Sequence, residues 1–154
     1  MGVALVLQAT HAHAADPEQE AKRTELYREG MADGEKGNWS SAVKKFRDVV
    51  AIRSAPKALI ALAIALEKTG HFAEARRTYA RALADAHTLG PSHGDEARAA
   101  NEALTRITPK VPRITPLLPS DVAARAYVVD GEKLDLQDGA IDVDVGSHSL
   151  DVES

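Results

Sequence analysis

The chain has 154 residues and the composition of an ordinary globular protein, with 44% hydrophobic and 27% charged residues. Its net charge of −4 argues against a nucleic-acid partner, and the absence of cysteine excludes disulfides, thiolate catalysis and cysteine-bound zinc. No apolar run approaches the roughly 20 residues that a membrane-spanning helix needs.

Residues 1–14 look like the second half of a secretory signal peptide. A short apolar run from Gly2 to Leu7 precedes Ala12-His13-Ala14, which has the small-x-small pattern that signal peptidase recognises. The composition turns polar at Asp16. This pattern predicts an exported, periplasmic or envelope protein. The alternative is the frayed, alanine-rich terminus of a cytosolic protein.

Five helices are predicted next, with Asp16, Asn38 and Ser92 as side-chain caps of the first, second and fifth. They cover about residues 17–36, 39–53, 56–69, 72–87 and 93–107. The third is apolar nearly all round, which is typical of a buried helix. Gly30 and Gly34 each cost about 1 kcal/mol inside a helix, so we expect another helix to pack closely against them.

Residues 37–46 match residues 70–79 at a fixed offset of 33. A repeat of this length is typical of stacked helical hairpins. The matched positions carry a glycine, an aromatic residue, an alanine and a second aromatic residue. The pairs are Gly37 and Gly70, Trp39 and Phe72, Ala42 and Ala75, and Phe46 and Tyr79.

This region resembles a pair of tetratricopeptide repeats. The resembling residues are Leu26, Gly30, Gly37, Trp39, Ala42 and Phe46 in the first unit, and Leu59, Ala63, Gly70, Phe72, Ala75, Tyr79 and Ala82 in the second. The resemblance implies a protein-binding module in which the first helix of each unit lines a concave groove. Carried onto this chain, the lining is Thr24, Tyr27, Met31, Lys57, Ile60, Ile64 and Lys68. The alternative for Ile60 and Ile64 is burial in the core against the first helix.

The sequence changes character after residue 108. Four prolines between residues 109 and 119 exclude a continuing helix, and period-2 alternation then predicts strands near 113–118, 125–129, 132–136, 140–145 and 148–153. Asp130-Gly131 is a hairpin signal. Asp142 and Asp144 alternate with Ile141, Val143 and Val145, which predicts a solvated strand face.

This C-terminal part resembles a PEGA-type domain, a small β-sandwich of bacterial envelope proteins. The resembling segments are Leu117-Leu118-Pro119, Val128-Val129-Asp130-Gly131-Glu132 and residues 145–152, whereas Pro119-Ser120-Asp121-Val122 departs from the tetrapeptide that names the family. The acidic series Asp130, Glu132, Asp135, Asp138, Asp142 and Asp144 offers calcium ligands as an alternative to a solvated face.

No motif in the chain indicates intrinsic catalysis. Ser92-His93-Gly94-Asp95 has the residue types of a hydrolase triad, but neighbours in one loop rarely face each other in that geometry. No two histidines have the i, i+4 spacing of a helical zinc site. We therefore expect no cofactor and no metal.

The sequence predicts an α+β protein with four parts. A signal segment at 1–14 precedes a helical domain at 15–108, which consists of two helical hairpins plus a capping helix. A proline-rich linker and first strand follow at 109–119, and a small antiparallel β-sandwich-like domain covers 120–154. The predicted function is a non-catalytic, exported bacterial adaptor that binds a peptide or helix of another protein. The alternatives are a self-associating envelope scaffold and an accessory subunit of an envelope enzyme.

Overall fold

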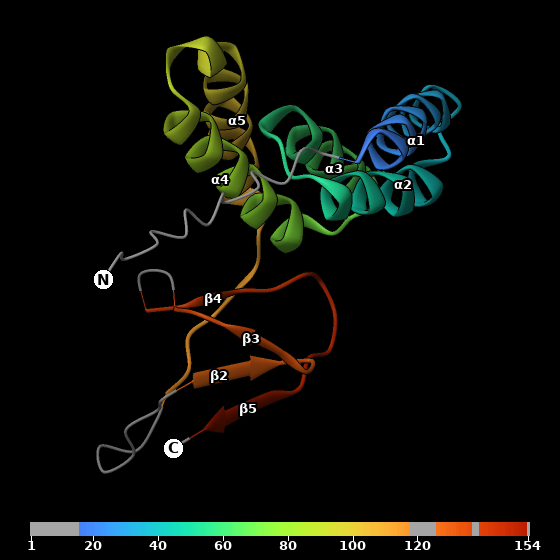
Figure 1. Cartoon of the computed structure of the whole chain (residues 1–154). Helices are drawn as coiled ribbons and strands as arrows, with labels where there is room; N and C mark the ends of the chain where they lie inside the picture. Colours follow the sequence, from blue (N-terminus) through green and yellow to red (C-terminus); the bar gives the residue numbers. More distant parts are fainter. Residues whose placement is uncertain (1–15, 118–125, 137–138, 154) are drawn as a thin grey trace, which may run out of the picture.

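The computed structural model describes residues 16–117, 126–136 and 139–153 (Figure 1). Within these residues five α-helices precede five short strands, so the predicted α+β class is confirmed. The predicted signal segment, residues 1–14, lies outside the described part of the chain. The helices are α1 (Pro17–Glu35), α2 (Trp39–Ile52), α3 (Pro56–Lys68), α4 (Phe72–Leu89) and α5 (Gly94–Ile107), with 3-10 turns η1 (Pro91–His93) and η2 (Thr108–Lys110).

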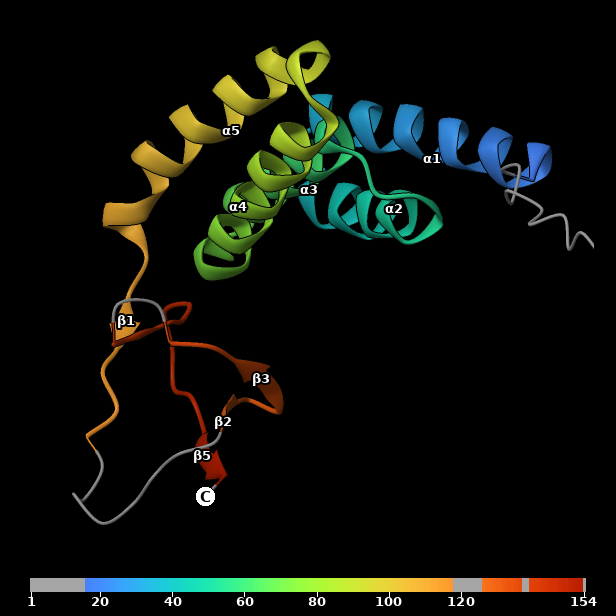
Figure 2. The ribbon, with the colours of Figure 1, turned by 60° about the vertical axis from the view of Figure 1, so that its left-hand side comes forward.

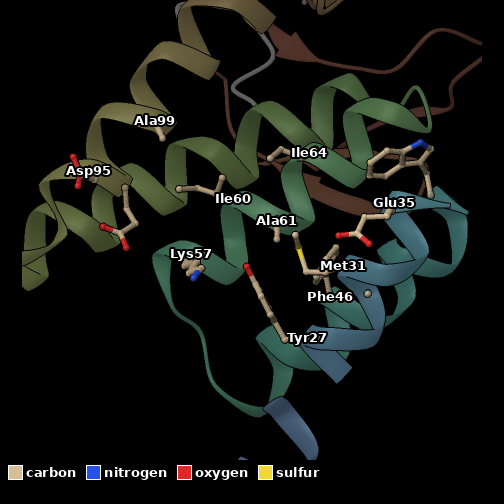
Figure 3. Close-up of a pocket in the computed structure, with 14 residues that line it drawn as sticks. Tyr27, Met31, Glu35, Phe46, Lys57, Ile60, Ala61, Ile64, Asp95 and Ala99 are labelled. Carbon is tan, nitrogen blue, oxygen red and sulfur yellow. The ribbon is translucent and has the colours of Figure 1, made fainter. Parts of the chain in front are cut away.

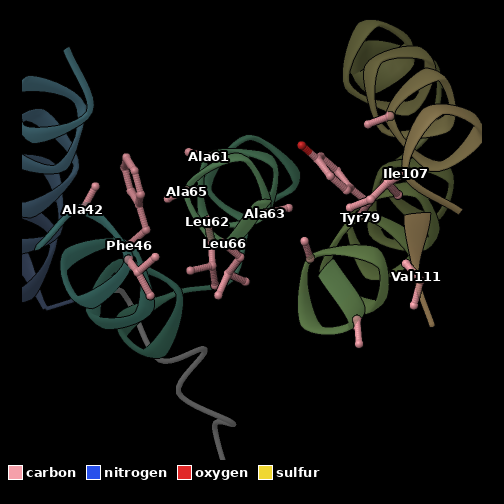
Figure 4. Close-up of a cluster of buried hydrophobic side chains, with 14 residues drawn as sticks. Ala42, Phe46, Ala61, Leu62, Ala63, Ala65, Leu66, Tyr79, Ile107 and Val111 are labelled. Atoms are coloured by element: carbon pink, nitrogen blue, oxygen red, sulfur yellow. The ribbon is translucent and has the colours of Figure 1, made fainter. Parts of the chain in front are cut away.

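The helices form one continuous stack. α1 packs on α2, α2 on α3, α3 on α4 and α4 on α5, as Figures 1 and 2 show. They share an apolar core in which the rings of Phe46 and Tyr79 are almost fully buried (Figure 4). These rings occupy equivalent positions on α2 and α4, as do the fully buried Ala42 and Ala75. The repeat in the sequence therefore corresponds to a repeated pair of helices.

The glycines of α1 let aromatic rings of α2 reach its backbone. A Cβ atom added at Gly30 would lie 2.8 Å from Cε1 of Phe46, and one added at Gly34 would lie 2.9 Å from Cζ3 of Trp39. Real Cβ atoms essentially never come so close to another heavy atom. The close helix contact predicted at these glycines is confirmed, and it explains why α1 holds two residues of low helix propensity.

One of the three predicted side-chain caps is confirmed. The Asp16 carboxylate accepts a hydrogen bond of 3.1 Å from the backbone N–H of Glu18. Asn38 precedes α2 but makes no side-chain capping hydrogen bond. Ser92 lies inside the 3-10 turn η1, and α5 begins at Gly94. The Ser92 prediction was wrong because helix-start residues also favour tight turns, so the pattern does not distinguish the two.

A carboxylate links three helices of the stack. Glu67 on α3 accepts hydrogen bonds from Nη2 of Arg106 on α5 at 2.9 Å and from the hydroxyl of Tyr79 on α4 at 3.4 Å. The hydrogen bond from Arg106 lowers the pKa of Glu67. Burial, reinforced by the Glu67 charge, raises the pKa of Tyr79 to about 12, so its hydroxyl remains a donor to Glu67 at neutral pH.

The strands form two small antiparallel sheets. In chain order they are β1 (Arg113–Ile114), β2 (Ala126–Val129), β3 (Glu132–Leu134), β4 (Ile141–Asp142) and β5 (Leu150–Glu153). β1 pairs with β4, and β2 lies between β3 and β5. Asp130-Gly131 forms the predicted hairpin turn, with both residues at positive φ. Each of the five strands lies within its predicted range, and each is shorter than predicted.

Two aspartates that the alternation assigned to a solvated face are instead turned towards α4. The Asp142 side chain is 4% exposed and forms ion pairs with Arg76 on α4 and with Arg113 on β1, the latter at 3.3 Å. Asp144 accepts a hydrogen bond of 2.7 Å from the backbone N–H of Ala73. The solvated-face prediction is wrong because alternation shows which residues share a strand face, and not what covers that face.

The N-terminus of α4 is consequently capped from the β region. His71, which precedes α4, makes no side-chain cap; its ring lies 2.9 Å from the Thr69 hydroxyl. The Asp144 carboxylate is favourable at this end because the helix dipole and the free N–H groups attract negative charge. Glu132, 3.4 Å from the guanidinium of Arg77, adds an ion pair between α4 and β3.

The loop that carries Asp144 is held by His148. Nδ1 of His148 lies 2.6 Å from the Asp130 carboxylate, and its Nε2 lies 2.7 Å from the backbone oxygen of Asp144. Both partners accept hydrogen bonds, so only the protonated ring can donate from both nitrogens, and the site favours the imidazolium form. Asp130 first, and then the Asp144 carbonyl, raises the pKa of His148. Arg77, Glu132 and Asp142 line the same small pocket.

We expect the stabilisation by His148 to be lost in alkaline solution. Because its folded-state pKa is raised, the contribution is complete below the unfolded value of about 6.5 and disappears as the pH rises through the folded-state pKa. Urea denaturation of the wild type and of His148→Gln between about pH 6 and pH 9 measures this. The stability difference should shrink towards the alkaline end. A difference that is constant with pH would contradict the imidazolium.

Candidate functional site

A groove of about 540 Å³ opens between α1, α3 and the first turns of α5 (Figure 3). Its volume lies within the roughly 300–1,000 Å³ of typical ligand sites. The lining of this α1–α3–α5 groove is apolar apart from four charged side chains. The lining residues are Tyr27, Gly30, Met31, Gly34, Glu35, Trp39, Phe46, Lys57, Ile60, Ala61, Ile64, Asp95, Glu96 and Ala99.

Aromatic rings form part of the groove wall because α1 carries glycines where it crosses α2. Phe46 and Trp39 occupy the space that side chains at Gly30 and Gly34 would need. Tyr27 packs on Phe46, with ring centroids 5.6 Å apart, and burial raises the pKa of its hydroxyl. The contacts that join α1 to α2 therefore also fix the aromatic surface of the groove.

α3 divides its apolar residues between the core and the groove. Leu59 and Leu66 are buried, whereas Ile64 remains 40% exposed and Ile60 is partly buried. From α1, the Met31 side chain is 44% exposed. Ile60, Ile64 and Met31 line the same opening (Figure 3). The sequence left open whether Ile60 and Ile64 line the groove or belong to the core. Ile64 lines the groove, and Ile60 contacts both the groove and the core.

The groove brings together five of the seven residues predicted for partner binding, namely Tyr27, Met31, Lys57, Ile60 and Ile64. Thr24 and Lys68 do not line it. Thr24 is exposed, and its hydroxyl donates a hydrogen bond of 2.9 Å to the backbone oxygen of Glu20 one turn earlier. The Lys68 ammonium lies 5.9 Å from the centroid of the Trp39 ring, beside the groove wall.

The sequence prediction missed the acidic side of the groove. Asp95, Glu96 and Ala99 come from α5, which was predicted only to close the stack, and Glu35 comes from the last turn of α1. The first turn of α5 carried a signal, because two carboxylates followed by small residues can border a cavity. Which face of α5 turns towards α3 depends on the crossing of α4 and α5, and no local pattern determines that angle.

Charged groups border the apolar centre of the groove on both sides. In Figure 3, Asp95 and Glu35 lie at opposite ends, with Ile60 and Ile64 between them. The Lys57 ammonium lies 5.9 Å from the centroid of the Tyr27 ring, within range of a cation–π interaction. The groove therefore combines an apolar and aromatic centre with a charged rim, which is the arrangement of a binding surface.

The structure does not assemble a triad from the Ser92–Asp95 loop. Nδ1 of His93 lies 3.9 Å from Glu96, and Asp95 pairs with Arg98 at 2.8 Å. Glu96 and Asp95 each lie three residues from their partners, His93 in η1 and Arg98 on α5, so both contacts are local to the start of that helix.

The acidic residues of the β region do not gather at one site either, because they contact different partners. Asp130 binds His148, Glu132 pairs with Arg77, and Asp142 and Asp144 contact α4. Asp138, from the predicted calcium series, lies outside the described residues. Among residues 16–117, 126–136 and 139–153, no three histidine, aspartate or glutamate side chains come together as a candidate metal site.

Comparisons with protein-family models, with curated proteins and with solved structures found no match to the chain. No helix in the described part of the chain is long and apolar enough to cross a membrane.

Proposed function

We propose that the chain is a non-catalytic protein-binding module whose α1–α3–α5 groove holds a short apolar segment of another protein. The observation that carries the proposal is the exposure of Met31 and Ile64 beside an aromatic wall. Covering apolar surface is favourable by about 25 cal/mol per Å². A contiguous exposed apolar surface with a polar rim is typical of an interaction site.

The arrangement of the helices supports this proposal. The repeated residues of α2 and α4 occupy equivalent positions, and α1 and α3, the first helices of the two pairs, both line the groove. That is the surface implied by the resemblance to tetratricopeptide repeats. We further propose an exported bacterial adaptor, in which the β region, similar to a PEGA-type domain, attaches to a component of the cell envelope.

The test is loss of partner capture when the groove alone is made polar. The double variant Met31→Gln/Ile64→Gln adds no charge and changes two partly exposed side chains, so the fold should persist, which circular dichroism verifies. The matched control is Leu89→Gln/Val145→Gln, because both residues are exposed and neither lines the groove. We expect at least about a tenfold loss of capture from an envelope fraction for the groove variant alone. Equal capture by both variants would contradict the proposal.

A further inference from the structure

The segment that fits the groove has a definite charge pattern. Resting on the proposed function, we propose that the partner segment carries lysine or arginine on both sides of its apolar residues. The groove lining holds three carboxylates, Glu35, Asp95 and Glu96, but a single lysine, Lys57. Complementary charge at a rim selects partners and accelerates their association.

The two ends of the groove contribute these carboxylates from different helices. Asp95 and Glu96 belong to the first turn of α5, and Glu35 belongs to the last turn of α1. Figure 3 shows Asp95 and Glu35 on opposite sides of the isoleucines. A basic group at one end of the bound segment would meet Asp95 and Glu96, and a basic group at the other end would meet Glu35.

Two of the carboxylates, Glu35 and Asp95, are available to a partner. Glu35 forms no ion pair within the described residues. The Asp95 side chain is 91% exposed, and its pair with Arg98 is an i, i+3 contact between exposed side chains, which is weak in water. The nearby lysines, Lys57 over Tyr27 and Lys68 over Trp39, offset the acidic rim only in part, because two ammonium groups face three carboxylates.

A second copy of the chain is a poor occupant. Two grooves that face each other would place Glu35, Asp95 and Glu96 of one copy near the same residues of the other, and like charges across an interface are unfavourable. The observations therefore favour a different protein with a basic, apolar, basic segment.

The proposal is tested with two synthetic probes that share a leucine-rich centre, one with lysines and one with glutamates at both ends. We measure their binding by fluorescence anisotropy. The lysine-flanked peptide should bind wild-type protein at least about tenfold more tightly, and added salt should reduce the difference. The double variant Glu35→Lys/Asp95→Lys should abolish or reverse the preference. The variant Asp48→Lys/Asp151→Lys has the same change of net charge on exposed residues outside the groove, and it should retain the preference.

The outcomes separate this inference from the proposed function. If both peptides bind equally well and Met31→Gln/Ile64→Gln abolishes both, the charge inference is overturned and the apolar groove remains a binding site. If neither peptide binds, both proposals are overturned. Loss of the preference in both charge variants would assign it to net charge and would also overturn the inference.

Discussion

Replacing Gly30 by alanine is expected to lower the free energy of unfolding by up to about 2 kcal/mol. Alanine normally stabilises a helix interior by about 1 kcal/mol relative to glycine. At this position the new methyl group would meet Phe46, a residue that is 2% exposed and belongs to the buried core beneath the groove. Overpacking of about 1–3 kcal/mol therefore outweighs the gain in propensity. Chemical denaturation followed by circular dichroism measures the difference.

Gly94→Ala is the matched control for this prediction. Gly94 is the first residue of α5, and an added Cβ atom there would have nothing within 4 Å. The same substitution should leave stability unchanged or raise it by up to about 1 kcal/mol. If both variants were stabilised, the close contact between α1 and the Phe46 ring would be contradicted. Gly34→Ala should cost less than Gly30→Ala, because Trp39 is only partly buried and its ring can move outwards.

Replacing Asp142 by asparagine is expected to lower the stability by about 2–3 kcal/mol and to loosen the β region from α4. The change leaves the guanidinium groups of Arg76 and Arg113 without their common carboxylate. Removing one partner of a buried ion pair costs about 3–5 kcal/mol. The expected value is lower here because the arginine side chains are 23% and 39% exposed and regain some hydration. Urea denaturation gives the total, and hydrogen exchange locates the loss.

Asp151→Asn removes the same charge from an exposed position on β5 and should change stability by less than about 0.5 kcal/mol. The double variant Asp142→Asn/Arg76→Gln should lose less stability than the sum of the losses of its two single variants. Each single variant already removes the ion pair between Arg76 and Asp142, so the sum counts that pair twice. Equal effects of Asp142→Asn and Asp151→Asn would show that the carboxylate does not hold the β region to the helices.

The helical part could be predicted from local signals because those signals agree with one another. Helix-breaking residues mark the ends, apolar spacing marks the buried faces, and the fixed offset of 33 residues places equivalent side chains on α2 and α4. Even the unfavourable Gly30 and Gly34 were informative, because their cost in an isolated helix required a neighbour. Strand lengths and two of the three caps were not predictable, since they depend on which turn the chain adopts.

Only the part of the candidate site that α1 and α3 form, as the first helices of the two repeated pairs, could be predicted. Tyr27 and Met31 on α1 and Ile60 and Ile64 on α3 follow from helix periodicity and the family resemblance. The α5 wall was missed, because its contribution depends on how one helix crosses another. Its acidic residues Asp95 and Glu96, together with Glu35 on α1, outnumber the predicted Lys57 and Lys68 and make the rim acidic.

The sequence by itself determined the helix pairs, their small and aromatic contact residues and the α+β class, because each is encoded by spacing within a few turns or by an internal repeat. Only the tertiary structure decided that Asp142 and Asp144 bind α4, that His148 bridges Asp130 and the Asp144 carbonyl, and that α5 completes an acidic groove. These properties join residues far apart in the chain, and a carboxylate on a strand has the same local pattern whether water or an arginine faces it.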